Sequence, residues 1–558
     1  MRLHKYNYTY GILYAIDVAM NQQPVHLEIQ TKRGNPCGVI RSSFREGGKI
    51  KHKSYGRITG VNLDTLRLIQ AAFRNKVIPS DAAEALQLLE SKEYGASRAL
   101  LSFAEGLGLA RIIYSRKEPW VSDIMAMIVG RVIYAGSKLS LSHQYKNSAL
   151  WELCGVSGPV NVREHCYAAM DRLLGRQDAI QKSLAAKHLK EGSLVLYDIT
   201  SSYLEGEYEE SDIVKFGYNR DGKRSHEQVV IGLLCSPEGC PVGVEVFAGN
   251  TQDASTVPGK IAEVQKRYGI KEIIFVGDRG MVTKSNQDKL EGTIGLSTIS
   301  ALTHPQMRKL LEAKVIHAEL FDEKNIAEVI DPENPKRRYC LCRNPKTAAR
   351  ETKTRQELLN KTRIELDKIA ASKRKTDSEK IGARVGKILQ QTKVGKFVCW
   401  SVTKNKLSWN FDEEKIAAEK ELDGCYIITS DVPVKLMEKT EIVASYKELI
   451  QVEMAFRNLK TVQLEMRPVY HKTDNRIRAH VFLCVLAYYL QWHINRSLQP
   501  LFESDGKYKD RAWTFRAVID RLSAIRQQRV KINKVEFNQI TIPDKDQKFI
   551  LDLLKIKM

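Results

Sequence analysis

The sequence has ten cysteines in 558 residues, but none of them form a CxxC pair. The two closest, Cys340 and Cys342, have one residue between them, which is the wrong spacing for a zinc knuckle. Scattered cysteines in a chain of this size are typical of a reduced cytosolic protein. The cysteine pattern therefore gives no support to a zinc-binding module or a secreted, disulfide-linked scaffold.

Long hydrophobic runs are also missing. The first residues of the chain contain no apolar segment of the kind that a secretory signal needs, so we expect none. The longest apolar run, Val481–Leu490, is too short to cross a bilayer and predicts a core helix. There is no internal repeat and no low-complexity tail. We therefore expect a cytoplasmic protein with no membrane partner.

Acidic residues are too few to balance the basic ones. Lysine and arginine total 88 against 66 aspartates and glutamates, which gives a net charge of +22. Such an excess favours a polyanionic partner, because cations that neutralise phosphates release counterions. The excess is greatest in residues 343–397, where 16 basic residues face 6 acidic ones. Charge runs are usually solvated, but this one is one-sided enough to predict contact with nucleic acid.

Hydrophobic residues make up 43% of the chain, which is typical of a globular protein. Short strands are expected from Tyr10 to about Ile58, and helices from Leu63 to about Leu109 and from Trp120 to Lys190. A strand-rich block follows. It consists of strands at 194–198, 229–235, 241–248 and 272–277, with a helix at 256–268 before the last.

These patterns divide the chain into six predicted regions. They are a strand-rich, DNA-binding region at 1–115, a helical region at 116–190, a core in two parts at 191–303 and 436–500, an insertion domain at 304–435 made of a basic helical hairpin plus strands, and a C-terminal region at 501–558.

Two of the predicted strands end in an aspartate. Asp198 follows the apolar run Val195–Tyr197, and Asp278 follows Ile273–Gly277. Either residue alone could simply begin a turn or cap a helix. A phosphatase-type nucleophile at Asp198 would need a second aspartate two residues later, where the chain has Thr200. The shared pattern of apolar strand, aspartate and polar turn favours a site built from both.

A third acid, Glu453, lies in a predicted helix from Glu441 to Lys460. Tyr446, Glu453 and Lys460 are seven residues apart, which places them on one face, with Arg457 close to it. The face could be solvated, with Glu453 and Arg457 as an ion pair. However, the same helix carries apolar residues that would pack on a core, namely Leu449, Val452, Phe456 and Leu459. Three converging carboxylates can hold two Mg²⁺ ions, with Mn²⁺ as a substitute.

The segment Tyr446-x2-Leu449-x3-Glu453-x6-Lys460 resembles the Tyr-x2-Arg-x3-Glu-x6-Lys signature of bacterial insertion-sequence transposases of the DDE type. One position departs from it, since Leu449 stands where the signature has arginine. Arg457 is a candidate to supply that charge. The resemblance covers about Gly192–Thr303 and Glu441–His493, and further matching segments are Gly217–Lys223, Phe247–Asp253, Gly277–Met281, Arg467–His471 and Arg476–His480.

The resemblance implies an α/β fold, namely an RNase H-like mixed-sheet core interrupted by an insertion domain, with an N-terminal β and helical region. It implies that Asp198, Asp278 and Glu453 are catalytic and hold the two Mg²⁺ ions, and that DNA is contacted by Tyr446, Lys460, Arg457 and Arg279. The expected activity is cleavage at the terminal inverted repeats of an element and joining of its 3′ ends to target DNA. A homodimer acting at the bacterial nucleoid is expected.

Two other functions remain open from the sequence. One is a non-catalytic DNA-binding protein derived from a transposase, although a binder has no need of three carboxylates beside DNA. The other is a structure-specific nuclease that has the same core but performs no strand transfer. Terminal inverted repeats in the DNA that flanks the coding frame would separate a transposase from both.

Overall fold

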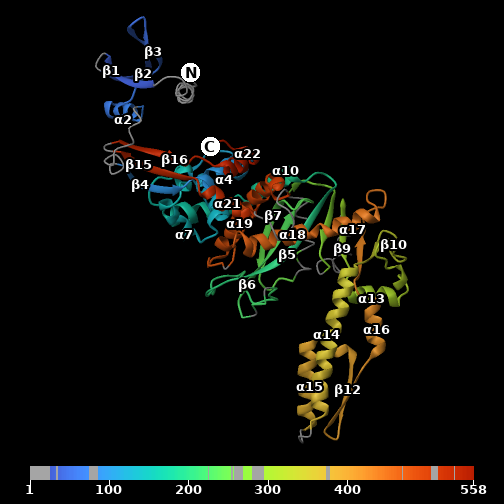
Figure 1. Ribbon diagram of the computed structural model, residues 1–558. Helices are drawn as coiled ribbons and strands as arrows, with labels where there is room; N and C mark the ends of the chain where they lie inside the picture. The colour runs from blue at the N-terminus through green and yellow to red at the C-terminus, as the bar shows by residue number, and fades with distance from the viewer. Residues whose placement is uncertain are drawn as a thin grey trace. The chain divides into compact units, whose positions relative to one another are not determined.

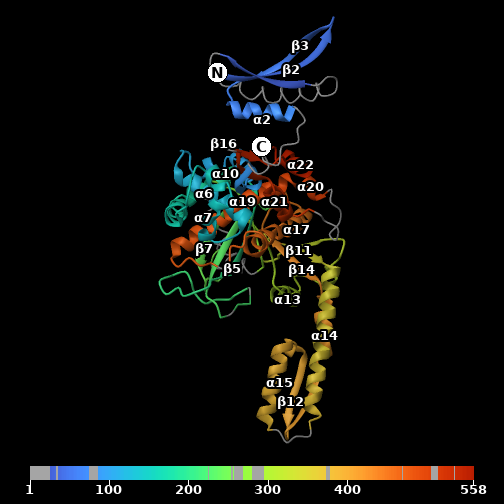
Figure 2. The same ribbon diagram turned by 60° about the vertical axis from the view of Figure 1, so that its left-hand side comes forward.

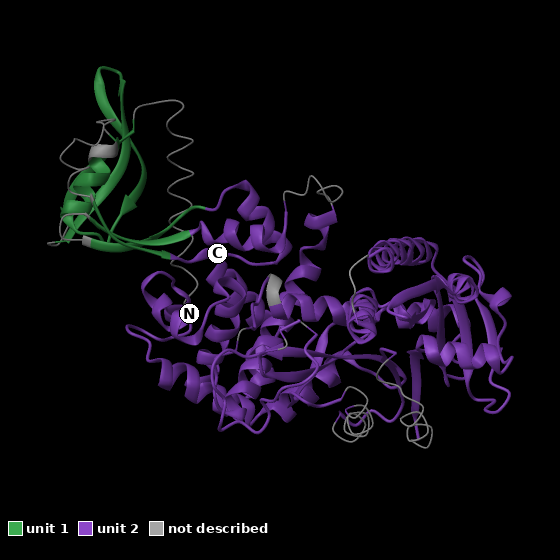
Figure 3. Cartoon of the chain, turned by 90° about the horizontal axis from the view of Figure 1, so that it is seen from below, with its two compact units in different colours: residues 1–92, 526–542 green, residues 93–525, 543–558 purple. Residues whose placement is uncertain are grey.

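The computed structural model describes residues 25–32, 35–73, 86–220, 222–223, 225–252, 256, 268–279, 294–372, 377–467, 469–503, 513–532 and 535–558. The chain divides into two compact units (Figure 3). Unit 1 comprises Met1–Lys92 and Arg526–Ile542, and unit 2 comprises Glu93–Ile525 and Pro543–Met558. The predicted helix at 256–268 lies almost entirely outside the described residues.

Unit 1 begins with an antiparallel sheet of β1 (Val25–Lys32), β2 (Asn35–Glu46) and β3 (Lys49–Ile58). Two glycines with positive φ, Gly47 and Gly48, make the turn from β2 to β3 without the strain that a side chain would cause there. Helix α2 (Leu63–Phe73) packs on this sheet, and the small core that they share contains Leu27, Ile40 and Leu66.

The expectation of helix from Leu63 to about Leu109 is wrong in its middle. Leu86–Glu93 is a strand, β4, which joins β15 (Arg526–Ile532) and β16 (Val535–Ile540) in a sheet of order β16-β15-β4. The local pattern of leucines and charged residues suits a helix as well as a strand, and the partner strand that decides between them comes from the far end of the chain.

The centre of unit 2 is a sheet of order β10-β11-β14-β9-β8-β5-β6-β7. Antiparallel pairing joins β5 (Ser193–Tyr203), β6 (Gln228–Cys235) and β7 (Pro241–Ala248), whereas β8 (Ile273–Gly277) and β9 (Leu296–Ala301) run parallel to β5 (Figure 1). The predicted strands are confirmed, and this order is that of an RNase H-like mixed-sheet core.

Helices that precede the strands of the sheet in the sequence, and helices that follow them, pack around the sheet. The long helix α19 (Asp474–Ser497) is buried along most of its length and contacts β7, α9 (Ala168–Leu174) and α6 (Pro119–Tyr134). Other described helices of this part are α4 (Gly95–Gly106), α5 (Leu109–Ile113), α7 (Lys138–His143), α8 (Leu150–Leu153), α10 (Gln177–His188), α20 (Gln499–Glu503), α21 (Phe515–Ser523) and α22 (Lys545–Leu553).

Among the described residues, no single helix has the length and apolar composition of a membrane span. One pair bent by 100°, Pro119–Tyr134 with Lys138–Lys146, meets those two criteria jointly, and its first member is a buried core helix.

Between β9 and the third acid the chain forms two substructures. Three strands, β10 (Ala327–Ile330), β11 (Arg338–Arg343) and β14 (Cys425–Ser430), extend the core sheet beyond β9. The limits of the predicted insertion domain stay a prediction, but these three strands belong to the core sheet. Helices α13 (His304–Glu312) and α16 (Glu413–Glu421) accompany them.

The second substructure consists of α14 (Pro345–Ala370), α15 (Ser378–Thr392) and the hairpin of β12 (Val398–Thr403) and β13 (Lys406–Phe411), and we call it the basic module. Its helices and hairpin lie side by side in both views (Figures 1 and 2). It has its own hydrophobic core, whose buried residues include Leu366, Ile381, Val385, Phe397 and Val398.

Candidate active site

The pairing of β5 with β8 places Asp198 and Asp278 next to each other, because Tyr197 is opposite Gly277 in the parallel register. The expectation that both aspartates end their strands is correct only for Asp278, since Asp198 lies inside β5, which continues to Tyr203. Consecutive residues before each acid are buried, which is typical of parallel strands covered on both faces. Asp198 is partly buried, whereas Asp278 is exposed at the strand end.

Glu453 reaches the same site from α18 (Leu449–Arg457), which packs on β5. The pKa of Asp198 reflects the charges of the other two acids. Burial, with smaller contributions from the charges of Asp278 and Glu453, raises the pKa of Asp198 to about 6 against the opposing effects of the Ile199 backbone N–H and of Arg220. The three predicted acids are therefore close enough for the charges of two of them to act on the third.

Tyr446 lies beside the second aspartate. Its hydroxyl donates a hydrogen bond of 3.3 Å to Asp278 Oδ1, and burial together with the negative charge of Asp278 raises the pKa of the phenol. Arg279 is exposed next to these groups, and its backbone N–H also donates to Asp278 Oδ1, at 2.7 Å. Tyr446 thus orients a carboxylate in this structure, which is a different contact from the DNA contact that the resemblance implies.

The expectation of one continuous helix from Glu441 to Lys460 is wrong. Helix α17 (Lys439–Lys447) ends before Glu448, α18 follows, and residues Asn458–Val462 form a π-helical turn. Tyr446, Glu453 and Lys460 therefore lie on three successive helical segments rather than on one helix. The prediction of a single helix was wrong because it assumed uniform helical geometry.

Lys460 is buried rather than exposed to solvent. Its side chain is 8% exposed, and its ammonium donates a hydrogen bond to Thr200 Oγ1, two residues after Asp198 on β5. Leu449, at the signature arginine position, is buried in the hydrophobic core. Arg457 is exposed at the end of α18.

Arg220 is a residue whose role the sequence did not reveal. Its guanidinium donates to the Ile199 carbonyl, its backbone N–H donates to Ser201 Oγ at 3.1 Å, and its charge lowers the pKa of Asp198. It lies in Gly217–Lys223, one of the segments that carry the family resemblance. The resemblance marked this segment as part of the site, but it did not distinguish Arg220 from the neighbouring polar residues.

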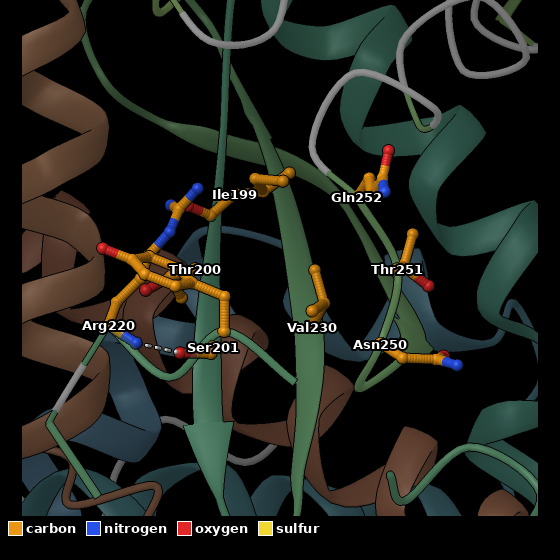
Figure 4. Close-up of a pocket in the computed structure, with 9 residues that line it drawn as sticks. Ile199, Thr200, Ser201, Arg220, Val230, Asn250, Thr251 and Gln252 are labelled. Atoms are coloured by element: carbon orange, nitrogen blue, oxygen red, sulfur yellow. Dashed lines mark hydrogen bonds between the residues drawn. The ribbon is translucent and has the colours of Figure 1, made fainter. Parts of the chain in front are cut away.

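A cleft of about 410 Å³ lies beside the part of β5 that directly follows Asp198 (Figure 4). Figure 4 shows Arg220, Thr200 and Ser201 on one side and Asn250, Thr251 and Gln252 on the other. Its lining also includes Tyr218, which is 88% exposed. Two segments that match the family, one with Tyr218 and Arg220 and the other with Asn250, Thr251 and Gln252, therefore line one cleft.

The raised pKa of Asp198 predicts a pH-dependent stability. A carboxyl whose pKa rises from 3.8 unfolded to about 6 folded stabilises the protein below about pH 4, and this contribution is lost as pH rises through about 6. In EDTA at pH 8, we expect Asp198→Asn to be more stable than wild type by roughly 2–3 kcal/mol, and this difference to vanish near pH 4. Thermal unfolding of both proteins across this range, with Asp552→Asn as the control on exposed α22, tests it. A stability difference between the two proteins that does not change with pH would contradict a raised pKa for Asp198.

Comparison with known proteins gives the class. The model of the transposase DDE domain family matches residues 190–490, more than half of the chain, and the chain belongs to this family. No curated protein matches. Among solved structures, a match is found to a Mos1 transposase paired-end complex with the left transposon end, with 16% identity and a TM-score of 0.13. That match covers 30% of this chain and 55% of the other, and a TM-score this low carries no argument.

Proposed function

We propose that this protein is the transposase of a DNA element, which binds the terminal inverted repeats, cleaves phosphodiester bonds at the element ends and joins the 3′-OH ends to target DNA. The observation that supports the proposal is the placement of Asp198 on β5 beside Asp278, which directly follows β8, with Glu453 of α18 near enough for its charge to act on Asp198. Two copies acting together at two ends, within the bacterial cytoplasm, complete the proposal.

The acids fit divalent metal ions. Carboxylate oxygens are the hard donors that Mg²⁺ prefers, and the repulsion that raises the pKa of Asp198 is what a bound cation would relieve. Asp198, Asp278 and Glu453 would hold two Mg²⁺ ions. When bound, these ions would supply activation of the attacking hydroxyl and neutralisation of charge at the scissile phosphate.

Other residues of the site orient these acids and face the substrate. Tyr446 fixes the carboxylate of Asp278 through its hydrogen bond. Arg220 places positive charge beside Asp198, where it can attract a phosphate group of the bound strand. Arg279 and Arg457 are both exposed and are positioned to contact flanking phosphates. Such contacts fix the position of the DNA on the protein but do not distinguish one base sequence from another.

The proposal is tested with the purified chain and DNA that carries the ends of its own element. Labelled end DNA is incubated with Mg²⁺, Mn²⁺ or EDTA, and a supercoiled plasmid is added as target. We expect metal-dependent nicking at the end and covalent joining of the 3′-OH to the plasmid. Cleavage without joining would indicate a structure-specific nuclease, and specific binding without cleavage would indicate a DNA-binding protein. Either result overturns the proposal.

A further inference from the structure

A second cleft in unit 2 has a cationic floor, and none of the three acids lines it. It has a volume of about 270 Å³ and lies between the end of α6, the start of α7, residues 465–467, 470–471 and α19. Five basic side chains line it, and three of them, Arg131, Lys138 and His480, are buried, with exposed fractions of 6%, 5% and 4%. Ser137 and Tyr470 are exposed at the rim, so the cleft is open to solvent.

The hydrogen bonds of these three groups go to neutral acceptors. His480 Nε2 lies 3.0 Å from the Met466 carbonyl, which can only accept, so Nε2 carries the proton and Nδ1 accepts from the Lys138 ammonium at 2.6 Å. Arg131 Nη1 donates to the Leu464 carbonyl at 3.3 Å. Within the described part of the chain, no carboxylate forms an ion pair with Arg131 or Lys138.

A buried cation without a counter-ion is costly, and the protein shows the consequence. Burial and the charge of Arg131 lower the pKa of Lys138 to about 7. Burial, Lys138 and Arg131 also hold the pKa of His480 well below its usual value, which agrees with a neutral imidazole. Glu465 lines the cleft as well, but it is exposed and pairs with neither cation. An anion in the cleft would provide the missing charge.

We propose that this cleft is a phosphate-binding pocket in which Arg131 and Lys138 hold a phosphate group, and that its occupant is a phosphodiester of the bound DNA. The forked guanidinium of arginine and the ammonium of lysine are the two side-chain groups best suited to bind phosphate oxygens. The identity of the occupant rests on the proposed function, whereas the chemistry of the pocket does not.

The position of the cleft favours DNA over a free anion. Val469, beside the rim, forms a parallel bridge with Leu204, just after the end of β5, and the Tyr208 hydroxyl donates to the Val469 carbonyl at 2.7 Å. Six residues of extended chain separate Leu204 from Asp198, roughly 20 Å. A duplex with its scissile phosphate at the acids therefore has backbone phosphates within reach of this pocket.

The first experiment uses inorganic phosphate as the probe and needs no cleavage activity. Melting of the full chain is followed in phosphate and in chloride at equal ionic strength, for wild type, for Lys138→Met and for Lys146→Met, a control at an exposed lysine nearby. We expect phosphate to raise the melting temperature of wild type and Lys146→Met but not of Lys138→Met. Equal responses in all three proteins overturn the pocket. Lys138→Gln serves if the methionine variant does not fold.

The second experiment places a DNA phosphate in the pocket. Single methylphosphonates, which are uncharged, are scanned through end DNA, and binding is measured in EDTA. We expect one position where wild type loses at least about eightfold in affinity at 0.1 M salt and Lys138→Met, which keeps only Arg131, loses clearly less, while the log–log salt slope of that variant falls by about 0.9. If phosphate stabilises wild type but no position shows this coupling, the pocket takes a free anion and the DNA assignment is overturned. Binding of end DNA without any cleavage would overturn the proposed function but not the phosphate-binding pocket.

Discussion

Asp278→Asn is expected to reduce cleavage of element-end DNA by about a thousandfold or more, equivalent to about 4 kcal/mol of activation free energy. The amide keeps the size of the carboxylate and can still accept the hydrogen bonds from Tyr446 and from the Arg279 backbone. However, it is neutral and a poor ligand for Mg²⁺. Because Asp278 is exposed, its replacement should leave the melting temperature almost unchanged.

The measurement compares initial cleavage rates in Mg²⁺ with affinity for the same DNA in EDTA. Asp552→Asn, the same substitution on exposed α22, should retain both wild-type values. A loss of binding that matches the loss of cleavage would make Asp278 a folding or DNA-binding residue. Cleavage at nearly the wild-type rate would exclude it as a metal ligand.

Sequence reasoning was most successful where the fold depends on local patterns. The strands at 194–198, 229–235, 241–248 and 272–277 were predicted because each is a short apolar run rich in β-branched residues, and the structure pairs all four in the core sheet. Helix α19 was predicted from its continuous apolar sequence. The meeting of the three acids follows from these elements, although their catalytic roles stay predictions.

The failures have a common physical cause, which is that the deciding interaction lies outside the local sequence. Strand β4 resembles a helix until β15 supplies its hydrogen-bonding partner. The break at Glu448 and the π-helical turn after Arg457 are changes of backbone geometry that a residue count cannot reveal. The cationic pocket joins Arg131 and Lys138 to His480 across hundreds of positions, so their proximity appears only after folding.

Neutralising one face of the basic module is expected to weaken binding of DNA strongly. Lys380, Arg384 and Lys387 are spaced by four and three residues on α15, so they share one exposed face, while Ile381 and Val385 of the same helix are buried in the module's own core. Their replacement should therefore leave folding intact. If each contacts a phosphate, the triple glutamine variant loses about 2.7 from the log–log salt slope and about 500-fold in affinity at 0.1 M salt.

The decisive comparison is with a variant of equal charge change at another place. Lys545, Lys548 and Lys557 are exposed in and after α22, and their replacement by glutamine also removes three positive charges. A loss caused only by net charge would be the same for both triple variants. A loss of direct phosphate contacts would be confined to the α15 variant, because the field of a distant charge is screened within about 8–10 Å at these salt concentrations. We expect the control to keep the wild-type slope. Equal slopes for wild type and the α15 variant would mean that the positive charge of this helix face serves only to solvate it.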